Sequence, residues 1–529
     1  MEDLLLLGGT VVDGTGGEPV TADVAVSNGV IQAIGDLAPS TARRVVDVTG
    51  AVVCPGFIDL HSHADYSIFA DPEAVTQLHQ GVTTLVTGNC GFSPFPVTDE
   101  HADDVRRHRA LGSEPLPWEW HTTAEFLAAV ERLPLGVNLA CLVGHGTLRI
   151  ATMGTERATA TESQATRMRE LLREAVGAGA VGLSSGLIYA PGSFATQAEL
   201  VGLCREIAAA GLIYTSHIRD EGNRHAEAIE EILAVAHATG ARVQVSHLKA
   251  IGPKNWGKVQ PALRSIEAAN RAGADVGTDV YPYTATNTTL TSRLPAWALD
   301  GGIPSLLERL ADETVSAHIA QDMADNVGAT FLPDRTIVSE LGPGAYADVV
   351  GRSIGEIADI LGVDAPSAVL ELLRAHHEKV RIVIHALSED DVQTVLSHPL
   401  AAVVSDGYVL TDEGEGMPHP RSFGTFTRVL GRYVRDLGVL SLSDAVRKMT
   451  GLPASRLGWT DRGTLRPGTI ADICVFDPQA VADRSTFEAP WQLSTGVVHT
   501  LIGGRFALED AAVADDHCGR LIRGRVAAA

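Results

Sequence analysis

The middle of the chain alternates short apolar runs with amphipathic stretches, whereas both ends consist of β-rich segments. Between the apolar runs, residues 163–179 and 222–240 repeat apolar positions at helical spacing and stop at a glycine, which predicts two surface helices. Strands that alternate with helices favour an α/β fold, a (β/α)8 barrel of the TIM type. The eight runs that we expect to form its strands are residues 56–63, 83–90, 137–146, 180–186, 213–218, 242–248, 275–283 and 401–407.

Two other regions depart from this alternation. Residues 381–387 form a ninth apolar run inside residues 284–400, which we interpret as an insertion before the last barrel strand and as a candidate lid. The β-rich ends are broken by Gly, Asn and Asp, and they predict a small β-sandwich domain built from both termini. The expected division is 1–54 for the first part of the sandwich, 55–455 for the barrel, and 456–529 for the second part and tail.

Length, net charge and cysteine content limit the classes of protein to which this chain can belong. A chain of 529 residues is too long for one simple domain. The net charge of −24 argues against nucleic acid or an anionic membrane as partner. The six cysteines are scattered without a C-x-x-C motif, so no disulfide framework is expected. Without a signal-peptide pattern or an apolar run of membrane-spanning length, the expected location is the cytoplasm.

The first candidate metal ligands lie at the end of the first barrel run. That run ends in His61 and His63, and Asp65 comes next. Residues two apart in a strand point to the same side, so both imidazoles are expected to face one cation. A His-x-His pair arises by chance about once in a chain with 19 histidines, so its setting after an apolar strand and Pro-Gly carries the interpretation.

Two later strands also end in histidine. His217 and His247 each follow a serine at the end of an apolar run. Either residue alone is more readily explained as a hydrogen-bonded histidine. Matching positions on successive strands favour a shared cation, and imidazole suits zinc and related metals.

Cys90 and Asp406 complete the set of strand-end residues. A lone cysteine is usually a small buried apolar residue, but glycines on both sides of the Asn89-Cys90 pair leave the sulfur uncovered. Asp406 precedes a glycine and has an alternative as a turn residue. At the end of the last barrel strand, its carboxylate can also reach a metal and transfer a proton.

These residues together resemble the amidohydrolase superfamily, and within it the D-aminoacylase branch, the N-acyl-D-amino-acid deacylases. Its most specific motifs are GNCGFSP at 88–94 and GLSSGLIYAPG at 182–192. Many superfamily members carry a carboxylated lysine on a middle strand, whereas residues 180–186 contain none, so Cys90 looks like the substitute bridge. The resemblance covers nearly the whole chain and includes PGFIDLHSHAD, GVTTLVTGNCGFSPFP, VGHGTLR, TSHIRDEG, VSHLKAIG, DVYPYTA and HPRSFGTF.

The resemblance implies a zinc centre with one tight site and a second, weaker one. The tight site is implied to consist of Cys90, His217 and His247. The weaker site is implied to consist of His61, His63 and Asp406, with Asp406 also the general acid/base. Implied substrate contacts are Tyr189, Lys249, Tyr281, Ser292 and Arg421. Lys249 has an equal alternative as a solvated rim lysine, and Arg421 has one as a loop salt bridge instead of a bidentate carboxylate partner.

The expected reaction is zinc-dependent hydrolysis of the amide bond of N-acyl-D-amino acids, or of similar N-acyl amides, to a carboxylate and a free amine. Metal-activated water attacks the carbonyl carbon, and Asp406 accepts and returns its proton. One alternative is a cyclic-amide hydrolase of the hydantoinase or dihydroorotase kind. A less favoured one is a non-catalytic barrel scaffold, although all six proposed ligands are present. The expected partner is a small N-acyl amino acid or related amide.

Overall fold

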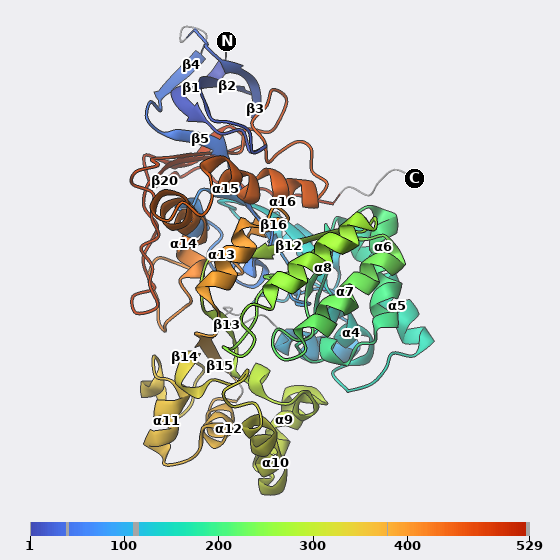
Figure 1. The fold of residues 1–529 in the computed structure, drawn as a ribbon. Coiled ribbons are helices and arrows are strands. Elements are labelled where there is room, and N and C mark those ends of the chain that lie inside the picture. Colours follow the sequence, from blue (N-terminus) through green and yellow to red (C-terminus); the bar gives the residue numbers. More distant parts are fainter. Residues whose placement is uncertain (1, 39–41, 109–115, 378, 525–529) are drawn as a thin grey trace.

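The computed structural model describes residues 2–38, 42–108, 116–377 and 379–524, and an eight-stranded parallel barrel lies at its centre (Figure 1). Each of the eight expected runs contributes one strand, and neighbours pair in chain order. The strands are buried along most of their length, as in parallel sheets covered on both faces. The predicted α/β barrel is thereby confirmed. Its strands are β6 (Phe57–Asp59), β7 (Val82–Thr87), β8 (Asn138–Gly144), β9 (Gly182–Gly186), β10 (Ile213–His217), β11 (Arg242–Val245), β12 (Asp275–Val280) and β16 (Ala401–Val403).

Helices surround the barrel, and the two expected from the sequence are α5 (Glu162–Ala178) and α7 (His225–Thr239). Thr161 caps the first turn of α5, and Gly179 ends the helix in the left-handed region with φ of 116°. A residue with a Cβ is disfavoured in that conformation, which is why glycine marks the stop. The other outer helices include α3 (Thr123–Val130), α4 (His145–Met153), α6 (Gln197–Ala210), α8 (Val259–Arg271), α13 (Glu389–Ser397) and α15 (Leu442–Met449).

The barrel closes between its first and last strands through a few specific contacts. Ser62 and Gly407 form an isolated parallel bridge just beyond β6 and β16. The backbone N–H of Asp406 donates to the His61 carbonyl over 2.8 Å. Below this bridge, the Asp59 carboxylate accepts hydrogen bonds from the backbone and the hydroxyl of Ser405. Two of the candidate metal ligands therefore lie on the seam that closes the barrel.

The ninth apolar run belongs to a separate three-stranded antiparallel sheet, where β15 (Val380–Ile384) pairs with both β13 (Thr286–Thr289) and β14 (Thr336–Leu341). This sheet and its helices have their own buried cluster, which includes Leu306, Ile357 and Leu372. Figure 1 shows these elements at the end of the molecule opposite the N-terminus. The helices are α9 (Gly302–Ala311), α10 (Glu313–Ala324), α11 (Ile354–Leu361) and α12 (Ala365–Ala375).

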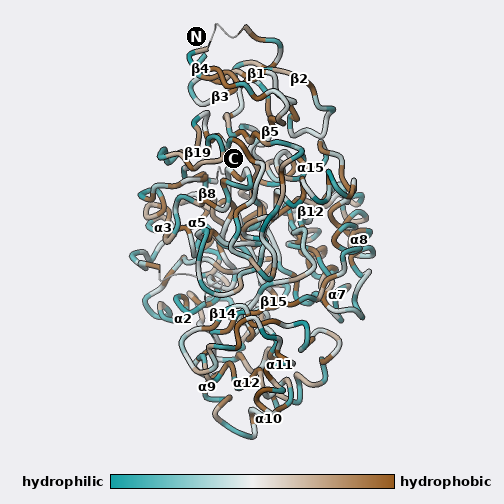
Figure 2. Tube along the Cα trace, turned by 90° about the vertical axis from the view of Figure 1, so that its left-hand side faces the viewer, coloured by the Kyte–Doolittle hydropathy of each residue, from teal (hydrophilic) through white to brown (hydrophobic). Residues whose placement is uncertain are grey.

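Strands from both termini join in one mixed nine-stranded sheet, which confirms the predicted β-domain. β5 of the N-terminal part pairs antiparallel with β17 of the C-terminal part, with Cys54 opposite Cys474. Figure 2 shows hydrophobic stretches in this sheet and again among α10 and α12. The strands are β1 (Glu2–Val11), β2 (Val20–Ser27), β3 (Val30–Gly35), β4 (Ala42–Asp47), β5 (Val52–Pro55), β17 (Ile473–Phe476), β18 (Val497–Ile502), β19 (Arg505–Glu509) and β20 (Ala512–Val513).

Among the residues that the structure describes, no helix combines the length and the apolar character needed to cross a bilayer.

Candidate metal centre

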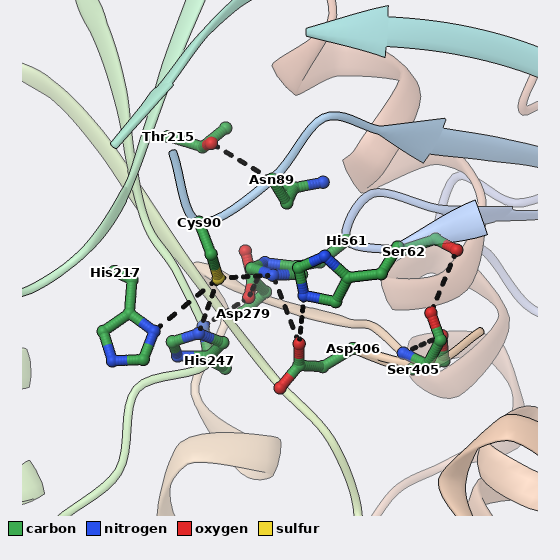
Figure 3. Close-up of polar contacts among 12 residues, drawn as sticks. His61, Ser62, Asn89, Cys90, Thr215, His217, His247, Asp279, Ser405 and Asp406 are labelled. Carbon is green, nitrogen blue, oxygen red and sulfur yellow. Dashed lines mark hydrogen bonds and ion pairs between the residues drawn. The ribbon is translucent and has the colours of Figure 1, made fainter. Parts of the chain in front are cut away.

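Three imidazoles from distant parts of the chain surround the sulfur of Cys90 (Figure 3). Its Sγ lies 3.3 Å from His61 Nε2, 3.6 Å from His217 Nδ1 and 3.5 Å from His247 Nε2. These residues follow or end β6, β7, β10 and β11, so they share the carboxyl-terminal mouth of the barrel. The sequence pattern predicted this location, and the structure brings the donor atoms to one point.

Asp406 joins this cluster from the opposite side of the closing seam. Its Oδ1 lies 3.1 Å from His63 Nε2 and 3.4 Å from His61 Nε2. Donor atoms of His61, Cys90, His247 and Asp406 all fall within 4.8 Å of one another. The residues expected at a tight and at a weaker site therefore form one continuous group, with His61 between the two.

The backbone holds three of these residues in the left-handed region. The φ angles are 54° for Cys90, 36° for His247 and 51° for Asp406. Non-glycine residues in this region cost of order 1 kcal/mol or more each, and such strain collects at functional sites. Next to Cys90, a Cβ on Gly91 would lie 2.7 Å from the Gly186 nitrogen, so only glycine permits this close approach.

Burial and neighbouring charge determine protonation in the cluster. Burial lowers the pKa of His61 well below its usual value and that of His247 to about 4, so both imidazoles are neutral near pH 7. For Asp406, burial opposes ionisation, but the charge of Arg421 and the nearby histidines outweigh it and bring the pKa well below the ordinary value. Burial raises the pKa of the Cys90 thiol, so its thiolate requires a compensating cation.

This set of donors fits a zinc ion. Neutral imidazoles, a cysteine sulfur and a carboxylate are the ligands that zinc takes in proteins. Ligand atoms about 2.0–2.3 Å from a tetrahedral zinc ion lie roughly 3.3–3.8 Å apart. The separations of Cys90 Sγ from the three imidazole nitrogens, 3.3–3.6 Å, match that spacing.

A cavity of about 590 Å³ opens above the cluster, and four of the five predicted substrate contacts line it: Tyr189, Lys249, Ser292 and Arg421. The fifth, Tyr281, is buried between two cations, with Lys249 Nζ 5.7 Å and the Arg421 guanidinium 5.0 Å from its ring centre. Lys249 is itself buried, so it is not a solvated rim residue. Parts of the insertion, including Thr288 and Arg381, complete the cavity wall.

Three buried carboxylates around the cluster had no role in the sequence interpretation. Glu221 Oε1 lies 3.4 Å from both His217 Nε2 and His247 Nδ1. Asp279 accepts the backbone N–H of His247 over 2.5 Å, and Asp59 accepts that of His61 over 3.2 Å. Their positions in the sequence could have identified them. Asp59 and Glu221 lie two and four residues from a predicted ligand, and Asp279 lies on the barrel strand next to that of His247.

His145 lies at a strand end, but the structure places it outside the cluster. It begins α4, and its Nε2 lies 2.7 Å from Glu199 Oε1. Arg149 donates to the other oxygen of that carboxylate over 2.5 Å. This buried triad joins α4 to α6 and has a structural role.

Comparison with known proteins gives the family of this chain. The model of the amidohydrolase family matches residues 44–507. The chain belongs to the amidohydrolase family. It is 39% identical to N-acyl-D-glutamate deacylase of Alcaligenes xylosoxydans xylosoxydans, over 98% of this chain and 96% of the relative.

Solved structures of family members superpose over nearly the full length. N-acyl-D-glutamate deacylase from Bordetella bronchiseptica, complexed with zinc and a phosphonate mimic of the tetrahedral intermediate, has a TM-score of 0.83 at 34% identity, covering 99% of this chain and 100% of that one. A D-aminoacylase studied for its binuclear metal centre has a TM-score of 0.83 at 35% identity, with the same coverage. This amidohydrolase therefore falls in the D-aminoacylase branch, as the sequence motifs predicted, and is a metal-dependent enzyme of that kind.

Proposed function

We propose that this amidohydrolase cleaves the amide bond of N-acyl-D-amino acids and releases a carboxylate and a free D-amino acid. The observation that carries this proposal is the meeting of Cys90, His61, His217, His247 and Asp406 beside a substrate-sized cavity, which all of them except His61 line. Full-length similarity to a deacylase that takes N-acyl-D-glutamate supports the same class of substrate.

For the metal, we assign Cys90, His217 and His247 to a tight zinc site. His61, His63 and Asp406 form a second, weaker one. A zinc ion bound there would supply Lewis-acid polarisation of the amide carbonyl and would lower the pKa of a water molecule. The buried setting of these ligands keeps competing solvent away from the reacting atoms.

Asp406 is the proton-transfer residue of the proposed reaction. Its carboxylate is ionised and lies at the cavity floor, so it accepts the proton of the attacking water. Asp406 Oδ1 then delivers that proton to the amide nitrogen as the C–N bond breaks. Arg421 donates to the other oxygen of this carboxylate over 2.7 Å and fixes its orientation.

The cations at the cavity wall suit the carboxylate that every N-acyl amino acid carries. Lys249 and Arg421 are both buried, and both line the cavity. Lys249 is paired with Glu221 and Arg421 with Asp406, but each cation has further N–H donors whose hydrogen bonds a substrate carboxylate can accept. Tyr189 and Ser292 also line the cavity and offer hydroxyl groups. The ring of Tyr281 contacts both cations.

A substrate screen with zinc-loaded protein tests the proposal. Matched pairs of N-acetyl-D- and N-acetyl-L-amino acids are incubated with the enzyme, and amine release is followed. We expect turnover of D substrates that is lost in Asp406→Asn. A hydantoin and a dihydropyrimidine serve as ring substrates, and ring opening without amine release from the linear amides would overturn the proposal in favour of a cyclic-amide hydrolase.

A further inference from the structure

Glu221 lies behind the proposed zinc site, on the side away from Cys90. It follows His217 by four residues in the loop after β10, and its side chain is 4% exposed. One carboxylate oxygen, Oε1, faces three nitrogen atoms: His217 Nε2 at 3.4 Å, His247 Nδ1 at 3.4 Å and Lys249 Nζ at 2.5 Å. Both imidazoles thus point one nitrogen toward Cys90 and the other toward Glu221.

The two imidazoles present different nitrogens to the centre. His217 offers Nδ1 to the cluster, whereas His247 offers Nε2. A neutral imidazole that gives one nitrogen to a cation carries its proton on the other, and that proton needs an acceptor. The outer nitrogen of His217 is buried and makes no hydrogen bond among the described residues, so the Glu221 oxygen is the acceptor within reach.

Lys249 does not serve as that acceptor for His247. Its Nζ lies 2.7 Å from His247 Nδ1, but an ammonium group has only donors. When His247 carries a proton on Nδ1, both groups require the same acceptor, and Glu221 Oε1 faces both. The 3.4 Å contacts exceed a typical hydrogen bond by a few tenths of an ångström, which a small side-chain movement closes.

We propose that Glu221 is the shared positioning carboxylate of the metal centre, which sets the tautomers and orientations of His217 and His247 together. This inference rests on the proposed zinc site and adds a residue to it that does not itself bind the metal. Because one oxygen serves both imidazoles, a change at Glu221 affects two ligands at once. Lys249 neutralises the carboxylate and ties it to the cavity wall.

The experiment compares zinc binding by wild type, Glu221→Gln and a matched control, Glu199→Gln. Glu199 is also buried and also contacts a histidine and a cation, but it lies outside the metal cluster. Zinc affinity is measured by competition with a chromophoric chelator, and the unfolding of each metal-free protein is measured in urea. We expect Glu221→Gln to weaken zinc binding about 10- to 100-fold and the control to leave it within about threefold.

A third variant separates the histidines from the lysine. Lys249→Met removes the cation but leaves Glu221 facing both imidazoles, so we expect a smaller loss of zinc affinity than in Glu221→Gln. The double variant should match Glu221→Gln. An equal loss in Lys249→Met would overturn the proposal, because the carboxylate would then act only by holding the lysine.

Cobalt substitution tests whether Glu221 is a ligand instead. Co²⁺-loaded Glu221→Gln should keep both the cysteine-to-cobalt charge-transfer band and the visible-band intensity of the wild type. A change of intensity that signals a lost ligand would contradict the positioning role. If wild type binds no zinc, the proposed metal site fails as well; if wild type and Glu221→Gln bind zinc equally, only this inference fails.

Discussion

Arg421 donates a hydrogen bond from Nη1 to Asp406 Oδ2 over 2.7 Å, and both side chains are buried at the cavity floor. The pair divides the two carboxylate oxygens between different partners, because Oδ1 faces His61 and His63. From the sequence alone, a substrate contact and a loop salt bridge are equally favoured roles for Arg421. The structure shows a salt bridge within the candidate site, made by a residue that still lines the cavity.

Replacement of Asp406 by Asn tests its assignment as general acid/base. The amide keeps the size of the side chain but cannot accept the proton from water, so we expect turnover to fall about 10²- to 10⁴-fold. Zinc at the tight site should remain, because Cys90, His217 and His247 are unchanged. The kcat is measured beside the zinc content, and near-normal turnover with zinc bound would remove Asp406 from this role.

Because Arg421 also pairs with Asp406, we expect Arg421→Met to reduce activity more than the loss of one substrate contact would. The variant leaves the Asp406 carboxylate buried without its cation, a change that typically costs about 3–5 kcal/mol. We expect kcat/KM to fall at least about 100-fold, with loss in both kcat and KM. An effect on KM alone would show that Arg421 binds substrate but does not orient Asp406.

Cys90→Ala tests whether the sulfur is a metal ligand. We expect zinc affinity to fall more than about tenfold and activity to fall with it, because the thiolate is a principal donor at the tight site. Cys204→Ala is the matched control, since Cys204 is buried in α6 away from the cluster. Metal analysis after dialysis distinguishes the two variants, and full zinc occupancy in Cys90→Ala would contradict the assignment.

Metal removal and stepwise return test the two-site arrangement. A chelator should abolish activity, and about one equivalent of zinc should restore most of it. A second equivalent should bind more weakly, because Asp406 is already paired with Arg421 and His61 Nε2 also faces the Cys90 sulfur. Calorimetric titration of the metal-free protein with zinc checks this, and two equal sites would refute the difference in affinity.

We expect the ionised carboxylate of Glu199 to contribute to the free energy of unfolding in a pH-dependent way. Burial opposes its ionisation, but hydrogen bonds and charges from His145 and Arg149 bring its pKa to about 2, below the ordinary 4.5. A lowered folded-state pKa stabilises the protein above pH 4.5, and this stabilisation is lost as the pH falls toward 2. We expect Glu199→Gln to lower the unfolding free energy by roughly 3 kcal/mol at pH 7, and the difference from wild type to shrink as the pH drops from 5 to 3 in urea unfolding. A difference that stays constant over this range would show that the carboxylate charge is not responsible.

The barrel strands and the candidate metal ligands were predictable from local pattern, whereas the expected reaction came from the resemblance to the D-aminoacylase branch. Apolar runs bounded by helices mark parallel strands, because both faces of such strands must be buried. The strand-end positions of Cys90, His217 and His247 followed from the same pattern, since functional groups of such barrels collect at one mouth. The sequence places the ninth run in the insertion, outside the barrel, but it does not show that this strand pairs with β13 and β14, because hydrogen-bond partners are chosen in three dimensions.

The relationships that set the chemistry depend on residues far apart in the chain. No periodicity indicates that Arg421 would pair with Asp406, or that Glu221 would face two imidazoles from successive strands. Side-chain type and spacing are local properties, so they identify the strands and the donor atoms. Distances and hydrogen-bond partners arise only when closure of the barrel brings those strands together, and burial then shifts the pKa values of the groups.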